Sequence, residues 1–183
     1  MMRDILIVSD THKRSLRLDE LISYRKSLLS KGDVLEVVFL GDGLEDLFSS
    51  RHYDDIIVHA VAGNCDYASR FSPYGEEMPT SRLLSFDKYK VFITHGHAFS
   101  VKQGYLELCR EASRLGADIV LFGHTHTRTL EYIEKGSIRG VDRDIVLFNP
   151  GSLGDFEGSF GNLNISDSGF LLSHGNYHNI IKK

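Results

Sequence analysis

Five short clusters of polar residues carry most of the side chains in this sequence that could bind a metal ion. Each cluster follows an apolar run of strand length, and the clusters are Asp10-Thr11-His12, Gly41-Asp42-Gly43, Gly63-Asn64-Cys65-Asp66, His95-Gly96-His97 and Gly123-His124-Thr125-His126. A mixture of imidazoles, carboxylates and an amide oxygen suits manganese, iron, zinc, cobalt or nickel better than calcium or magnesium. The clusters therefore predict a transition-metal centre.

The spacing within the clusters leaves the division of ligands between ions open. Asp10 and His12 are two positions apart, as are His124 and His126, and residues at this spacing point to the same side of an extended segment. Taken singly, a residue such as Asp42 between two glycines is an ordinary turn former. Turn chemistry alone does not require a ligand-type side chain after every strand, so the metal hypothesis is preferred. The isolated histidines are interpreted as hydrogen-bonded structural residues: His52, His59, His174 and His178.

The elements that must bring the clusters together alternate between strands and helices. Apolar runs predict strands at residues 5–9, 34–40, 56–62, 83–86, 89–94, 119–122, 130–133, 145–148 and 170–172, with the first three buried on both faces. Apolar residues at helical spacing predict helices that end at Gly32 and Gly116. The pair Asp87-Lys88 between two strands predicts a hairpin, and the last third of the sequence is predicted to form hairpins. In open α/β sheets the carboxyl ends of the strands converge on one crevice, where the clusters would meet.

Length, composition and charge narrow the class of protein. A chain of 183 residues predicts a single domain, residues 1–183, with a substantial core. The two cysteines, Cys65 and Cys109, are far apart and suit a reduced compartment. No export signal or membrane-spanning run is visible, so we expect a cytoplasmic protein without a membrane partner; a homo-oligomer is compatible with these properties. The net charge of -4 argues against nonspecific nucleic-acid binding.

The order and content of the clusters resemble the calcineurin-like metallophosphoesterase superfamily. Its pattern is D-x-H, G-D, G-N-[HC]-[DE], G-H and G-H-x-H, and each block has a counterpart here, although Thr94 stands where the family has Gly before His95. The resemblance runs from about residue 5 to residue 152 and includes Asn149-Pro150-Gly151-Ser152, which is similar to the small phosphodiesterase branch. It implies an α/β fold, a four-layer αββα sandwich with two central mixed sheets.

The resemblance also implies a dinuclear metal centre that hydrolyses a small phosphate ester with a metal-bridging hydroxide. The implied ligands are three for each ion and one bridging carboxylate: Asp10, His12 and His126; Asn64, His95 and His124; and Asp42 as the bridge. This division sends His124 and His126 to different ions. Two divalent ions are expected, manganese first, with nickel, cobalt, iron and zinc compatible. Asn64 would also contact the substrate, and His97, two positions beyond a ligand, would contact the substrate or support a neighbouring ligand. No side chain is assigned as a catalytic residue.

Two departures from the family pattern bear on the substrate. Many phosphomonoesterases of the superfamily have a histidine that protonates the leaving group where this chain has Cys65. Without a strong general acid, phosphodiesters or esters with good leaving groups are expected as substrates. Residues 153–161 lack the Pro-Arg that often follows in relatives.

Two other functions compete with the phosphodiesterase prediction. The first is a non-catalytic, metal-binding interaction scaffold, since a retromer subunit of similar fold acts through its surfaces. The second is a His-x-His amidohydrolase, which the length disfavours because that chemistry usually needs barrels of about 250 residues.

Overall fold

Two five-stranded sheets and four α-helices make up the chain in this computed structural model, which describes residues 3–181. In order, the elements are β1 (Arg3–Val8), α1 (Ser15–Ser27), β2 (Glu36–Phe39), α2 (Leu44–Phe48), β3 (Ile57–Ala60), β4 (Ser81–Phe86), β5 (Tyr89–Thr94), α3 (Leu106–Leu115), β6 (Ile119–Phe122), β7 (Thr129–Ile133), β8 (Ile145–Asn149), β9 (Ser159–Ser166), β10 (Gly169–Asn176) and α4 (His178–Ile181). Short 3-10 turns span Tyr53–Asp55 and His97–Phe99.

Both sheets mix parallel and antiparallel pairs. The first has the order β10-β9-β1-β2-β3, with β1, β2 and β3 parallel and β9 antiparallel to β1. The second has the order β4-β5-β6-β8-β7, with β5, β6 and β8 parallel and antiparallel strands at both edges. The prediction of two central mixed sheets is confirmed.

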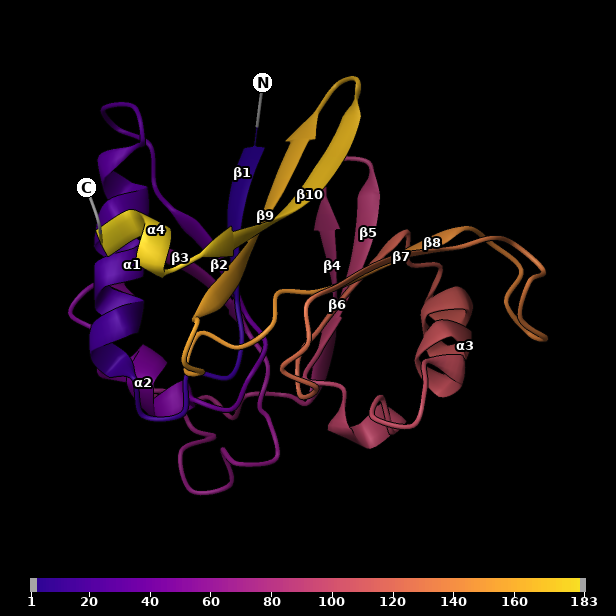
Figure 1. The fold of residues 1–183 in the computed structure, drawn as a ribbon, viewed down its shortest axis with the longest axis horizontal. Coiled ribbons are helices and arrows are strands. Elements are labelled where there is room, and N and C mark those ends of the chain that lie inside the picture. The colour runs from indigo at the N-terminus through magenta and orange to yellow at the C-terminus, as the bar shows by residue number, and fades with distance from the viewer. Residues whose placement is uncertain (1–2, 182–183) are drawn as a thin grey trace.

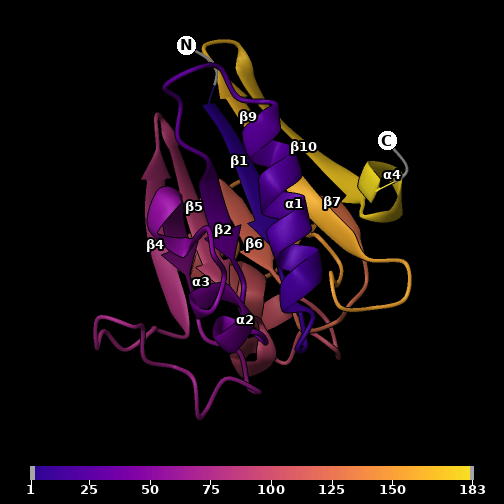
Figure 2. The same ribbon diagram turned by 90° about the vertical axis from the view of Figure 1, so that its left-hand side faces the viewer.

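The sheets pack face to face and the helices cover their outer faces, which gives four layers (Figure 1). Strand β1 has apolar side chains on both faces. Ile5 and Ile7 pack between the sheets, while Leu6 and Val8 pack on the side of α1. A strand that is apolar at every position must be covered on both faces. Helix α1 lies over the first sheet (Figure 2), and α3 packs on the second. The predicted αββα sandwich is confirmed.

Several local predictions differ from the structure. Helix α1 ends at Ser27, before the predicted Gly32, because the backbone N–H of Leu28 already closes the last turn on Arg25 and Lys26 carbonyls. Helix α3 does end at Gly116, which adopts the left-handed conformation at φ 73°. Strand β3 is not buried on both faces, because it forms the edge of its sheet. Strand β9 and helices α2 and α4 were not predicted.

The carboxyl ends of five parallel strands lead directly into the five polar clusters. Strands β1, β2 and β3 precede the clusters at Asp10, Asp42 and Asn64, and strands β5 and β6 precede those at His95 and His124. The fold thus places the candidate site at one end of both sheets. No helix between residues 3 and 181 combines the length and apolar character that a bilayer-spanning segment requires.

Candidate metal centre

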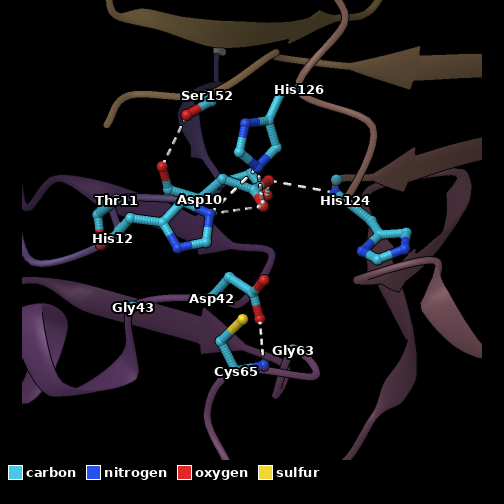
Figure 3. A network of polar contacts seen from close by, with 12 residues as sticks. Asp10, Thr11, His12, Asp42, Gly43, Gly63, Cys65, His124, His126 and Ser152 are labelled. Atoms are coloured by element: carbon cyan, nitrogen blue, oxygen red, sulfur yellow. Dashed lines mark hydrogen bonds and ion pairs between the residues drawn. The ribbon is translucent and has the colours of Figure 1, made fainter. Parts of the chain in front are cut away.

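A buried carboxylate, Asp10, is the meeting point of three histidines. Its Oδ1 atom lies 3.1 Å from Nε2 of His126, 3.6 Å from Nε2 of His12 and 4.0 Å from Nε2 of His95. The Nε2 atoms of His12 and His126 are themselves 3.1 Å apart. Figure 3 shows His126 pointing toward Asp10 and His12, which lie together on the loop after β1. Such a grouping offers three donor atoms to a single cation.

A second carboxylate, Asp42, joins this group to the remaining histidines. Its Oδ2 atom lies 3.3 Å from Nε2 of the fully buried His95. The donor atoms of Asp42, His95 and His124 all lie within 4.8 Å of one another, and those of Asp42, His12 and Cys65 do so as well. Asp42 therefore lies between donors on both sides of the site.

Asn64 and His97, predicted to contact substrate, line one pocket beside this cluster. Asn64 is exposed and its amide donates a hydrogen bond to Sγ of Cys65 at 3.4 Å. The His97 ring lies 5.4 Å from the His95 ring, and its Nδ1 atom is buried without a hydrogen-bond partner in residues 3–181. Both side chains thus flank the donor cluster.

The backbone turns sharply at most of the candidate ligands. Positive φ angles occur at Asp10 (54°), His12 (44°), Asp42 (55°), His124 (68°) and His126 (58°). Residues other than glycine rarely adopt this conformation, and such strain concentrates at functional sites. It also explains why His124 and His126, two positions apart, reach different donor groups, since the same-side rule holds only for extended chain.

Two glycines allow the loops to approach the carboxylates closely. A Cβ atom on Gly63 would lie 2.1 Å from Oδ1 of Asp42, and one on Gly123 would lie 2.0 Å from Oγ of Ser9 and 2.9 Å from Oδ2 of Asp10. No real Cβ atom tolerates such contacts, so these positions require glycine for steric reasons.

Hydrogen bonds to the outer atoms of the histidines orient their inner nitrogens. Nδ1 of His95 donates to the carbonyl of Leu40 at 2.7 Å, which directs the lone pair of Nε2 toward the carboxylates. Nδ1 of His126 lies 3.1 Å from the Asp155 carboxylate. Metal-binding histidines usually have a carbonyl or carboxylate partner of this kind. The sequence did not identify Asp155, because only the folded chain brings its loop to His126.

Asp66 joins the loops that carry two of the clusters. Its carboxylate is 2% exposed and accepts four backbone hydrogen bonds, from the N–H groups of Asp42, Gly63, Gly43 and Leu44 at 2.7, 2.8, 2.8 and 2.9 Å. The sequence placed Asp66 within a cluster without predicting this role. Its position three residues after a glycine turn was the available signal.

The carboxylates and histidines of the site shift one another's pKa values. Burial opposes ionisation of Asp10, but the close imidazoles of His12 and His126 outweigh it and hold the pKa of Asp10 well below its usual range. Burial likewise opposes ionisation of Asp42, but the close imidazole of His95 outweighs it and lowers the pKa of Asp42 to about 2. The neighbouring Asp10 carboxylate raises the pKa of His126 to about 8. The carboxylates are ionised at neutral pH and concentrate negative charge in the site.

The donor atoms fit a bound cation. Oδ1 of Asp10 and Nε2 of His95 are both buried without a hydrogen-bond partner in the described chain. Oδ2 of Asp10, in contrast, accepts hydrogen bonds from Oγ of Ser9 at 2.5 Å and the backbone N–H of His124 at 3.2 Å. Buried polar atoms without partners are costly, and a cation between carboxylate and imidazole donors removes that cost.

Comparison with protein families identifies the group to which the chain belongs. The model of the calcineurin-like phosphoesterase superfamily domain matches residues 2–178. The chain belongs to this superfamily. The resemblance carried by the five clusters is thereby confirmed over nearly the whole sequence.

Curated members of the superfamily include relatives at about 30% identity. The chain is 31% identical over 150 residues to the probable metallophosphoesterase YsnB of Bacillus subtilis, covering 82% of this chain and 75% of that protein. It is 30% identical over 156 residues to a phosphodiesterase of Methanocaldococcus jannaschii, covering 79% of this chain and 81% of that protein.

Solved structures share the fold. A conserved uncharacterized protein of Streptococcus pneumoniae, described as a predicted phosphoesterase, superposes with a TM-score of 0.71 at 24% identity, covering 97% of this chain and 91% of that chain. Vacuolar Protein Sorting 29 of Cryptosporidium parvum superposes with a TM-score of 0.62 at 18% identity, covering 96% and 97%. At these identities the likeness shows the fold alone.

Proposed function

We propose that this metallophosphoesterase hydrolyses a small phosphodiester with two divalent metal ions. The observation that carries the proposal is the convergence of three histidines on the buried Asp10, whose inner oxygen has no hydrogen-bond partner in residues 3–181. A relative at 30% identity is named a phosphodiesterase, which supports the same reaction class.

The donor groups support a division of ligands between two ions. Asp10, His12 and His126 form one group, and Asp42, His95 and His124 form another. Asp42 would hold both ions, since it also groups with His12, and Asn64 on the neighbouring loop would add a donor to the second set. Imidazole, carboxylate and amide donors suit manganese, and nickel, cobalt, iron and zinc are compatible.

The side chains of the site prepare it for an anionic ester. When bound, the two ions supply an acidified water and stabilise charge on the phosphoryl oxygens. The Asp155 carboxylate orients the His126 ring, and the Leu40 carbonyl orients the His95 ring, so that their Nε2 atoms face the site. Burial lowers the pKa of His97, which favours its neutral imidazole form. His97 and Asn64, on one pocket wall, contact the phosphate oxygens or the ester group.

The environment of Cys65 supports a preference for diesters. Cys65 stands where many phosphomonoesterases of the superfamily have the histidine that protonates the leaving group. Its thiol lies in one donor group with Asp42 and His12, where a bound cation would favour the thiolate, so it is a poor proton donor to a leaving group. Esters with good leaving groups, such as activated diesters, depend least on that proton.

The test compares bis(p-nitrophenyl) phosphate with p-nitrophenyl phosphate. Metal-stripped protein is assayed for release of p-nitrophenol after manganese, nickel, cobalt, zinc or magnesium is restored, beside Asp42→Ala. We expect metal-restored turnover of the diester that exceeds turnover of the monoester and disappears in Asp42→Ala. A higher kcat/KM for the monoester would contradict the inference from Cys65.

The scaffold alternative predicts a different outcome of the same assay. The likeness to Vacuolar Protein Sorting 29 extends to the fold alone, whereas this chain brings two carboxylates and four histidines together in one cluster. A scaffold would bind metal without turnover of either ester under any metal.

A further inference from the structure

A pocket of about 610 Å³ opens directly beside the His126 side of the metal centre. We call it the Phe156 pocket, and its walls include His126, Thr127, Arg128, Ser152, Asp155 and Phe156. His126 and Ser152, which Figure 3 shows on the same side of Asp10, both line this pocket. Sites for small organic ligands commonly have volumes of roughly 300 to 1,000 Å³. The pocket therefore has room for an ester group much larger than a phosphate.

Phe156 presents its ring to solvent from a well-anchored loop. Its side chain is 89% exposed, more than any other large apolar side chain in the described chain. The carbonyl of Phe156 accepts a hydrogen bond from Nε2 of His178 at 2.8 Å. Arg17 donates to the carbonyls of Leu153 and Asp155 at 3.1 and 2.5 Å, fixing the preceding turn. An exposed aromatic ring held on an ordered loop beside a reaction centre is typical of a ligand contact.

The polar side chains in the walls of the pocket indicate which chemical groups a ligand there would carry. Arg128 makes no hydrogen bond or ion pair with another residue between residues 3 and 181, which leaves its guanidinium available for stacking or hydrogen bonding. The carboxylates of Asp155 and Glu157 lie on the same walls. They would repel a second phosphate group but accept hydrogen bonds from hydroxyl or amino groups. A neutral, planar group that carries such donors fits this combination.

A second aromatic residue beside the site, Tyr67, is less suited to this role. It lines the pocket of Asn64 and His97 and is 82% exposed. The Arg70 guanidinium lies over its ring at 5.3 Å and is itself held by Glu77 at 3.2 Å. One face of the Tyr67 ring is therefore already covered by a paired cation.

We infer that the Phe156 pocket selects the ester group of the substrate, and that this group is a nucleoside whose base stacks on Phe156. The inference rests on the proposed phosphodiesterase function and assigns its substrate class. Arg128 stacks on or hydrogen-bonds the base, and Asp155 and Glu157 accept hydrogen bonds from the sugar hydroxyls or base amino groups. Phe156 and Arg128 are specificity residues, since they contact the group that does not react.

The test compares two esters with the same leaving group. The p-nitrophenyl ester of thymidine 5′-phosphate and methyl p-nitrophenyl phosphate both release p-nitrophenol, so their kcat/KM ratio reports recognition of the nucleoside. Stacking of a base on an aromatic side chain has an effect large enough to give a ratio of roughly tenfold or more. The ratio is measured for the manganese-loaded wild type, Phe156→Ala, and the matched control Tyr67→Ala. Both substituted rings are largely exposed, so both variants keep the fold.

The expected result is a thymidine preference of roughly tenfold that falls toward one in Phe156→Ala and persists in Tyr67→Ala. Equal kcat/KM for the two esters in the wild type, or loss of the preference in Tyr67→Ala alone, would overturn the inference and leave the phosphodiesterase proposal standing.

A binding measurement separates failure of the inference from failure of the proposed function. If neither ester is hydrolysed with any metal, the proposed function fails. Titration calorimetry then compares thymidine 5′-phosphate with 2-deoxyribose 5-phosphate, which lacks the base. Tighter binding of the nucleotide that Phe156→Ala removes would support the pocket assignment. Equal affinities for the two ligands would refute it.

Discussion

Replacing Asp66 by asparagine tests how the loops of the metal centre are held. Oδ2 of Asp66 accepts the N–H groups of Asp42 and Gly63, and Oδ1 accepts those of Gly43 and Leu44. Asparagine has nearly the same shape, but one oxygen becomes an NH₂ group that cannot accept a hydrogen bond. Either orientation of the amide therefore leaves two backbone donors facing another donor.

The size of the expected destabilisation follows from the number of hydrogen bonds that the substitution removes. Hydrogen bonds to a charged acceptor contribute about 1.5 to 3 kcal/mol each, so losing two destabilises the fold by about 3 to 6 kcal/mol. That is a large part of the roughly 5 to 15 kcal/mol that holds a typical domain together. We expect a correspondingly lower free energy of unfolding for Asp66→Asn in urea denaturation followed by circular dichroism.

The matched control is Asp33→Asn, at an exposed aspartate in the loop between α1 and β2. Exposed substitutions of this type change stability by less than about 0.5 kcal/mol. A loss below about 1 kcal/mol in Asp66→Asn would refute the role given to its four hydrogen bonds.

Three further changes test other parts of the structure. Asp155→Asn should weaken manganese binding about 10- to 100-fold in calorimetric titration, because it removes the carboxylate that orients His126. Gly63→Ala should lower metal affinity and destabilise the fold by about 1 to 3 kcal/mol, because its Cβ atom would lie 2.1 Å from Oδ1 of Asp42. Burial opposes ionisation of Glu36, but hydrogen bonds from His59 and Arg3 lower its pKa from 4.5 to about 2. Since the folded pKa is depressed, the stability advantage of wild type over Glu36→Gln should be full above pH 4.5 and fall as pH decreases toward 2 in acid-unfolding measurements.

Each of these three predictions has a result that contradicts it. Unchanged manganese affinity in Asp155→Asn would show that its contact with His126 has no orienting effect, and Glu157→Gln is the matched carboxylate control. Gly136→Ala adds a methyl group with no atom within 4 Å, so it should leave metal affinity unchanged, although its φ of 78° makes the substitution cost some stability. Equal metal affinities in Gly63→Ala and wild type would contradict the steric argument. A Glu36→Gln stability difference that is constant with pH would contradict the pKa assignment.

The strands, helices and polar clusters could be predicted from local patterns, whereas the four-layer fold was predicted from the resemblance to the superfamily. Strand β6 (Ile119–Phe122) and the end of α3 at Gly116 matched their predictions because an apolar run and a glycine cap are local signals. Strand β9 (Ser159–Ser166) was missed because glycine and asparagine, rare in strands, interrupt its apolar residues. Its Asn162 and Asn164 side chains instead bind Arg25 and Asp4, which only the folded chain brings near.

Contacts between segments far apart in the chain could not be predicted from the sequence. The pairing of His126 with Asp155 depends on two loops that meet only in the folded chain. The positive φ angles at His124 and His126 separate two residues whose spacing suggested a common direction. The isolated histidines agreed with their structural interpretation, since His59 bonds Glu36 and His174 bonds the carbonyl of Asn149.

The most direct test of the central claim is the turnover of bis(p-nitrophenyl) phosphate as manganese is titrated into metal-stripped protein. We expect no turnover without metal, two ions bound per chain, and activity that appears as the second site fills. Binding of two ions without turnover, for manganese and the other candidate metals alike, would contradict the proposed hydrolysis and favour a scaffold. Turnover that is equal in stripped and loaded protein would contradict any role for the metal centre.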